Sequence, residues 1–124
     1  MGVTYAALRL SHFGRDDIES LDADALVDTG ANNIVPQSVV DQLHLAPIGQ
    51  RNVQLADGRR ASFPCVGPLL VESMGRRCIT DALVMGDQVL LGTIALQAMD
   101  MVVHPASHRL LPNPESPDIQ SSRA

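Results

Sequence analysis

The chain has 124 residues, of which 45% are hydrophobic, and this is enough for one domain with a modest core. Its formal net charge is −5 and its basic residues are not clustered, which excludes nucleic acid and an anionic membrane surface as expected partners. No stretch is long enough to cross a membrane and no secretory signal is visible, so we expect a cytoplasmic protein.

The N-terminal region predicts two antiparallel strands, at residues 4–10 and 18–27, joined by a polar turn. The second strand alternates apolar and polar residues with the period of two that is typical of a half-buried strand. Its apolar positions are Leu21, Ala23, Ala25 and Val27. We expect this strand to bring Asp28 onto its apolar face, where an unpaired carboxylate costs on the order of several kcal/mol. Asp28 therefore needs a partner or a function.

A short helix and a hairpin follow in the chain. Pro36 suits the first turn of a helix, which should end near His44 because a proline and a glycine come soon after it. Residues 53–63 predict a hairpin, since Asp57 and Gly58 form a favourable turn between two strand-like runs.

Residues 66–85 predict a second hairpin rich in β-branched and apolar residues. Pro64 and Pro68 cannot donate to a central ladder, so we expect an edge, bend or bulge between the two hairpins. Cys65 and Cys78 fall too far apart along the second hairpin to form a disulfide, and two buried free thiols are expected. Two isolated cysteines are also too few for a metal site, so we expect no metal and no other cofactor.

The C-terminal part predicts four short elements and a tail. Strands are expected at residues 89–91, 101–104 and 109–111, and a helix at 94–99. From Pro112 onward the chain is polar and rich in Pro and Ser, which is typical of a segment without a core of its own. We therefore expect a folded domain over residues 1–111 and a flexible tail over residues 112–124.

Two segments and the hairpin between them carry a resemblance to a known family. Residues 25–36 read ALVDTGANNIVP, and residues 89–96 read VLLGTIAL. In this order, with the hairpin at 53–63 between them, they resemble the active-site loop, the flap and the second glycine motif of retropepsins, the single-lobe retroviral type of aspartic protease. The chain is similar to a bacterial-type member over roughly residues 3–103. The resemblance implies an all-β fold, a closed β-barrel of the retropepsin (acid protease) type with one or two short helices, functional as a homodimer.

The resemblance also implies the activity of an aspartic endopeptidase, which hydrolyses peptide bonds with a water activated by two carboxylates. Because the chain has a single Asp-Thr-Gly, the dyad must form across a homodimer that acts on a peptide or protein substrate. The catalytic set implied is Asp28 as acid and base, Thr29 as the brace between the two loops, and Gly30 as a main-chain contact. The implied substrate-binding residues are Ala31, Asn32, Asn33, Ala56, Asp57, Gly58 and Leu90, of which Ala56, Asp57 and Gly58 form the flap tip.

Two departures from the viral pattern occur together. Asn32 and Asn33 stand where viral relatives carry two aspartates, and Thr93 stands where they carry an arginine. Because both members of that ion pair are replaced, neither is left buried without a partner. The departures concern substrate contacts and specificity more than the hydrolytic step.

Other interpretations remain open. The alternative to the endopeptidase is a catalytically silent, dimeric peptide-binding or regulatory module with the same fold, which the intact Asp-Thr-Gly makes the second choice. A third interpretation places Asp28 in a structural turn of an unrelated β-barrel, but it leaves the glycine motif after residue 91 unexplained. For the dimer, we expect the terminal strands at residues 4–10 and 109–111 to contribute to the interface, as exposed sheet edges.

Overall fold

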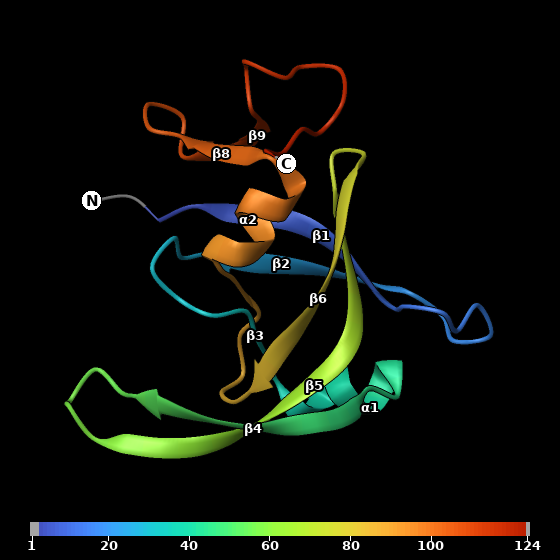
Figure 1. Ribbon diagram of the computed structural model, residues 1–124, viewed down its shortest axis with the longest axis vertical. Helices are drawn as coiled ribbons and strands as arrows, with labels where there is room; N and C mark the ends of the chain where they lie inside the picture. The colour runs from blue at the N-terminus through green and yellow to red at the C-terminus, as the bar shows by residue number, and fades with distance from the viewer. Residues whose placement is uncertain (1–2, 124) are drawn as a thin grey trace.

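The computed structural model describes residues 3–123, whose strands form one seven-stranded sheet and one two-stranded sheet (Figure 1). The elements in chain order are β1 (Tyr5–His12), β2 (Leu21–Val27), β3 (Ile34–Val35), α1 (Gln37–Leu43), β4 (Ala46–Gln54), β5 (Arg60–Ser73), β6 (Arg76–Val84), β7 (Leu90–Leu91), α2 (Thr93–Met99), β8 (Met101–His104) and β9 (Arg109–Pro112). The expected all-β fold with two short helices is confirmed. Neither of the helices in this part of the chain is long enough to span a membrane.

Six strands of the large sheet close into a barrel in the order β1-β2-β7-β3-β6-β5, because β1 also pairs with β5. β1 pairs with β2 over residues 5–10 and with β5 over residues 9–12, so it changes its principal partner along its length. β4 pairs with β5 alone and extends from the barrel as the outer strand of a long hairpin. The predicted closed β-barrel is therefore confirmed.

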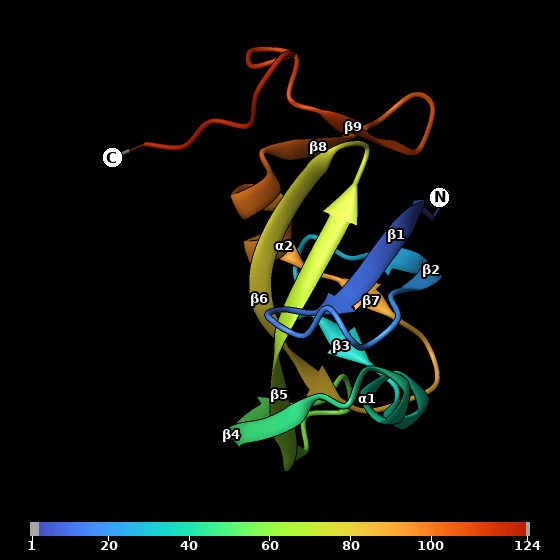
Figure 2. The same ribbon diagram turned by 90° about the vertical axis from the view of Figure 1, so that its right-hand side faces the viewer.

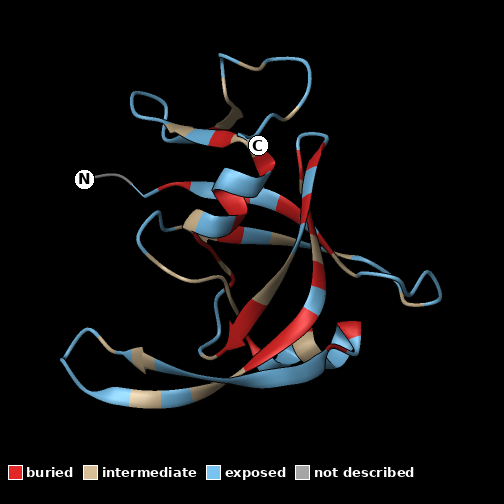
Figure 3. Cartoon of the chain, in the orientation of Figure 1, coloured by how far each residue is buried: buried red, intermediate tan, exposed pale blue. Residues whose placement is uncertain are grey.

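The core consists of aliphatic side chains that alternate with exposed ones along the strands. In β1, Ala6, Leu8 and Leu10 are buried, whereas the residues between them are exposed. The helices add Val39 and Leu43 from α1, and Ala95, Leu96 and Met99 from α2. Figure 3 shows that burial is concentrated in the barrel, whereas most of β4 and the hairpin tip are exposed. The exposed hairpin is thus an arm attached to a packed barrel.

Both predicted hairpins are present, and they share β5. Backbone bonds of the turn at Asp57 and Gly58 close the first hairpin, with Gly58 at a φ of 88°, where glycine is favoured. Pro64 and Pro68 lie within β5, and the pairing of β5 with β6 shifts register between Val66 and Leu69. The expected irregularity near the prolines therefore takes the form of a bulge inside one long strand.

Two expectations about the second strand are wrong. β2 begins at Leu21, three residues later than the sequence pattern suggested. Asp28 does not lie on the apolar face either, and it is exposed. The reason is the alternation itself, because a strand that turns Ala25 inward turns every even-numbered neighbour outward. The carboxylate is available at the surface of the single chain.

The β8–β9 hairpin and the segment that follows it lie at the end of the barrel opposite α1 and β4 (Figure 2). Gln120 in this segment donates hydrogen bonds to the carbonyls of Arg77 and Ala98. The polar composition of residues 112–124, from which we expected a flexible tail, did not predict these contacts.

Cys65 and Cys78 are free and buried, as expected from their separation. Burial raises the pKa of Cys78 to about 11, and burial together with the nearby Asp81 carboxylate raises the pKa of Cys65. At pH 8 both thiols are therefore mostly protonated and shielded.

We expect the native protein to react with a chromogenic disulfide reagent at least about tenfold more slowly than protein unfolded in guanidinium. Equal rates would contradict the burial of these side chains.

Candidate active site

The loop that contains Asp28 begins where β2 runs parallel to β7. Leu26 pairs with Leu90 and Val27 with Leu91 in this short parallel ladder. The ladder continues past the strand, since the Asp28 amide donates to the Leu91 carbonyl over 3.0 Å. The pairing of these two strands thus fixes the point at which the chain emerges as Asp28.

Local hydrogen bonds then shape the loop itself. The Gly30 amide donates to the Asp28 carboxylate at 3.0 Å, and the Ala31 amide donates to the Asp28 carbonyl at 3.2 Å. Asp28, Thr29 and Gly30 are all exposed. The loop therefore presents its carboxylate to solvent with one lone pair already oriented by a backbone amide.

Gly92 lies directly against the backbone of this loop at Ala31 and Asn32, and we call this contact the Gly92 seat. A Cβ atom at this position would collide with the Ala31 carbonyl oxygen and lie 2.8 Å from the carbonyl carbon of Asn32. The Thr93 amide also donates to the Ala31 carbonyl at 3.4 Å. A glycine is needed here because two backbones touch. The structure thus brings together residues 25–36 and 89–96, the two segments that carry the resemblance.

The Asn33 side chain forms three hydrogen bonds to other groups of the chain. Its Oδ1 accepts a hydrogen bond from the Gly92 amide at 2.8 Å, while its Nδ2 donates to Thr80 Oγ1 at 3.1 Å and to the Asp81 carbonyl at 3.2 Å. An aspartate could not donate to these two acceptors, so the amide fits where a carboxylate would not. Asn33 braces the loop against α2 and β6, and its predicted contact with substrate stays a prediction.

Asn32 joins the loop to the exposed hairpin. Arg51 on β4 donates from Nη1 to Asn32 Oδ1 at 3.1 Å, and its Nη2 lies 3.7 Å from the Asp81 carboxylate. Both charged side chains are well exposed, so this ion pair adds little stability. A pocket of about 20 Å³ lies here, lined by Ala31, Asn32, Asn33, Arg51, Thr80, Asp81, Leu83 and Ile94. Sequence reasoning missed Arg51 and Asp81, because both look like ordinary solvated charges.

The predicted flap tip lies at the end of the β4–β5 hairpin. Ala56, Asp57 and Gly58 are exposed, and in Figure 1 this hairpin and the loop after β2 project toward the same side of the molecule. Hydrogen bonds from the Arg59 amide and then from its guanidinium lower the pKa of Asp57. Leu90, the remaining predicted residue, is half-buried in β7 beside Leu26.

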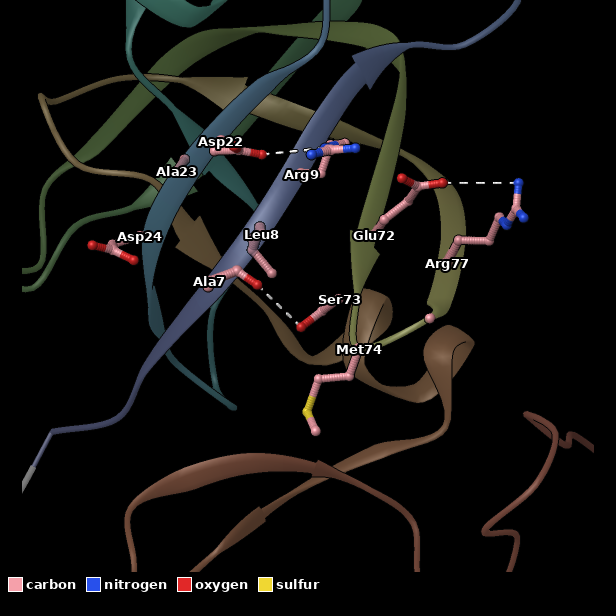
Figure 4. Close-up of a pocket in the computed structure, with 11 residues that line it drawn as sticks. Ala7, Leu8, Arg9, Asp22, Ala23, Asp24, Glu72, Ser73, Met74 and Arg77 are labelled. Carbon is pink, nitrogen blue, oxygen red and sulfur yellow. Dashed lines mark hydrogen bonds and ion pairs between the residues drawn. The ribbon is translucent and has the colours of Figure 1, made fainter.

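A larger cavity of about 570 Å³ lies away from Asp28, between β1, β2 and the turn from β5 to β6 (Figure 4). Four of its charged lining residues form ion pairs, with Arg9 3.2 Å from Asp22 and Arg77 3.8 Å from Glu72, and the fifth is Asp24. Asp28 is not among its lining residues, so this cavity is no part of the candidate site. Within residues 3–123, no group of three or more His, Cys, Asp or Glu side chains is arranged to hold a metal ion.

Comparison with known proteins gives a structural match only. No family model and no curated protein matches this chain. Among solved structures, the chain is similar to the EIAV protease complexed with the inhibitor HBY-793, with a TM-score of 0.57 and 18% sequence identity, over 77% of this chain and 86% of that chain. Together with the closed barrel, this similarity shows that the chain has a retropepsin-like fold.

The seat at Gly92 generates a prediction about stability. In Gly92→Ala the new methyl group must displace the backbone at Ala31 and Asn32, and we expect the free energy of unfolding to fall by about 2–4 kcal/mol. Gly30→Ala is the matched control, because a Cβ there meets only Asp28 Oδ1, at an ordinary 3.7 Å. Urea denaturation of both variants measures the difference, and equal losses would show that the seat does not hold the loop.

Proposed function

We propose that this chain, which has a retropepsin-like fold, is one subunit of a homodimeric aspartic endopeptidase that hydrolyses bonds in a peptide or protein substrate. The observation that supports the proposal most is the exposed Asp28 carboxylate on a loop held from beneath by Gly92 and Asn33. A carboxylate that served the fold alone would be expected to bond distant parts of the chain. Asp28 instead accepts a local hydrogen bond from Gly30, which leaves room for a second carboxylate.

In the proposed dimer, Asp28 of each subunit meets its twin at a two-fold axis, and the two carboxylates share one proton. The ionised carboxylate takes a proton from a water as that water attacks the peptide carbonyl, while the protonated one donates to the developing oxyanion. The tetrahedral intermediate collapses as the newly protonated carboxyl gives its proton to the leaving nitrogen, while the other carboxylate takes a proton from a hydroxyl of the intermediate. The amine and the carboxylic acid are released, the shared-proton pair is restored, and no bond to the enzyme forms. Thr29 braces the two loops across the axis, and Gly30 contacts the substrate main chain.

The remaining predicted residues line the path of the substrate in this proposal. Leu90 and Ala31 supply apolar contacts beside the dyad, and the hairpin tip at Ala56 to Gly58 closes as a lid that excludes water. Arg51 is added to this set, because it carries the contact between hairpin and loop at Asn32. A lid anchored at Arg51 moves mainly beyond that point, toward its tip.

The small sheet offers the surface for the second subunit. β8 and β9 pair with each other and with no other described strand, so both outer edges carry unpaired backbone groups. Val102 on β8 is 39% exposed. The expected contribution of the first strand stays a prediction, since β1 pairs with β5 only over residues 9–12 and residues 5–8 pair with β2 alone. We therefore assign the interface mainly to the β8–β9 hairpin and the Asp28 loop, with this open part of β1 beside them.

The chemistry is tested by Asp28→Asn, which is nearly isosteric and removes the proton transfer. We expect cleavage of a peptide library to be lost, while the dimer and peptide binding are preserved. For the parent chain we expect fastest cleavage at about pH 5 to 6, where a shared proton is available to the pair. Asp24→Asn, a change at an exposed residue of β2, is the control and should cleave normally.

Two outcomes count against the endopeptidase. Undiminished cleavage by Asp28→Asn would remove Asp28 from the reaction. Peptide binding without cleavage by the parent chain at every pH would favour the silent binding module.

The interface assignment is tested by Val102→Arg. A charge on this strand should raise the dimer dissociation constant by about tenfold or more, because it must be buried or displaced when two sheets meet. Ile79→Arg, at a residue of β6 that is 56% exposed, is the control and should leave the constant unchanged. Sedimentation velocity over a range of concentrations gives both constants. Dimerisation equal to that of the parent chain in Val102→Arg would place the interface elsewhere.

A further inference from the structure

The segment after β9 is joined to two elements at once by one side chain. Gln120 accepts a hydrogen bond from the Arg77 amide at 3.0 Å and donates to the Arg77 carbonyl at 2.9 Å, as a strand partner would. The same side-chain amide donates to the Ala98 carbonyl at 2.9 Å. Arg77 belongs to β6 and Ala98 to α2, so Gln120 holds the barrel and the helix together.

A buried ion pair lies beneath this segment. Arg76 is 5% exposed, donates to the Asp100 carbonyl at 2.8 Å, lies 3.5 Å from the Asp100 carboxylate, and donates to the Ser116 carbonyl. The carboxylate also accepts from Asn113 Nδ2 at 2.9 Å, from the Ser121 amide at 2.9 Å and from the Ser116 hydroxyl. Buried charges are destabilising when a partner is removed. The segment supplies most of the donors that Asp100 uses.

Asp100 occupies the junction between two elements of the proposed dimer. It caps the C-terminus of α2 in the left-handed conformation, with a φ of 56°, and β8 starts at the next residue. The Asn113 amide donates to the Asp100 carbonyl at 3.0 Å, which closes the base of the β8–β9 hairpin. At its other end α2 begins at Thr93, beside the loop carbonyl of Ala31. Asp100 therefore connects the segment to the hairpin directly and to the Asp28 loop through one short helix.

We propose that residues 113–121 form a clasp, held by Arg76 and Asp100, that positions the β8–β9 hairpin and thereby controls assembly of the active dimer. The proposal rests on the proposed function, because it takes that hairpin as the dimer surface. An isolated two-stranded sheet is marginally stable in water, so its orientation depends on what is packed at its base. Arg76 and Asp100 are positioning residues, since they act through the hairpin and touch no reacting atom.

The clasp stays closed in mildly acidic solution. Hydrogen bonds from Ser116, Asn113 and Ser121 lower the pKa of Asp100 from 3.8 to about 2. A lowered pKa contributes stability that is present above the ordinary value of 3.8 and is lost as the pH falls toward about 2. Assembly at about pH 5 to 6, where the dyad is expected to work, is therefore not opposed by opening of the clasp.

The experiment compares chains that end at different residues. A chain that ends at Pro112 lacks the clasp, and we expect its dimer dissociation constant to rise by about tenfold or more. A chain that ends at Ser121 keeps every clasp contact described above and should dimerise like the full chain. Cleavage per subunit should return to the full value at high protein concentration. It should also return when two chains ending at Pro112 are joined by a flexible linker, because the linker raises the effective concentration of each subunit.

Single substitutions distinguish a specific loss of the clasp contacts from general unfolding of the protein. Asp100→Asn removes the charge that Arg76 and the segment share, and we expect weaker dimerisation from protein that is still folded by circular dichroism. Glu115→Gln is the matched control within the segment, because the side chain of Glu115 is exposed and its backbone amide makes the local contact. If the chain that ends at Pro112 does not fold, the comparison of Asp100→Asn with Glu115→Gln decides the question.

Dimerisation of both the chain ending at Pro112 and Asp100→Asn with the constant of the full chain would overturn the clasp. The same holds if the linked, shortened chains stay inactive while the linked full chains cleave. Failure of the endopeptidase has a different signature, which is cleavage by Asp28→Asn or no cleavage by the full chain. The two proposals can therefore fail separately.

Discussion

The contact between Gly92 and the backbone of Ala31 and Asn32 is the constraint on which the candidate site depends. Two chain segments about 60 residues apart touch through their main chains, and a side chain at Gly92 would separate them. The parallel pairing of β2 with β7 brings the segments to this point, and Asn33 fixes them there with hydrogen bonds to Gly92 and to β6. The exposed position of Asp28 follows from these backbone and side-chain contacts beneath the loop.

This arrangement gives a physical account of the two amides at Asn32 and Asn33, where the resemblance alone would imply aspartates. Asn33 offers an acceptor to Gly92 and donors to Thr80 and Asp81, a combination that a carboxylate cannot supply. Asn32 holds Arg51 without placing a second negative charge beside Asp81. The two amides therefore make different contacts: Asn33 braces the loop from inside, and Asn32 links it to the exposed hairpin.

Most of the strands, both helices and the turn at Asp57 and Gly58 were predictable, because period-two patterns, Pro36 and turn residues act locally. The resemblance supplied the barrel, which the structure and the similarity to a retroviral protease confirm. The side of the strand on which Asp28 lies was mispredicted through a misjudged alternation. Arg51 and the pair of Arg76 and Asp100 could not be found from patterns, since their partners lie 13 to 40 positions away. The assignment of Asp28 as catalytic remains a prediction.

The double pairing of β1 has a consequence for how the chain folds. β1 is synthesised before its second partner, β5, which reaches Glu72 only after roughly 60 further residues, and closing so long a loop slows folding. Until then the edge of β1 near Arg9 stays open to any other strand, including the same segment of a neighbouring nascent chain. Barrel closure is therefore the late, non-local step at which correct folding competes with aggregation.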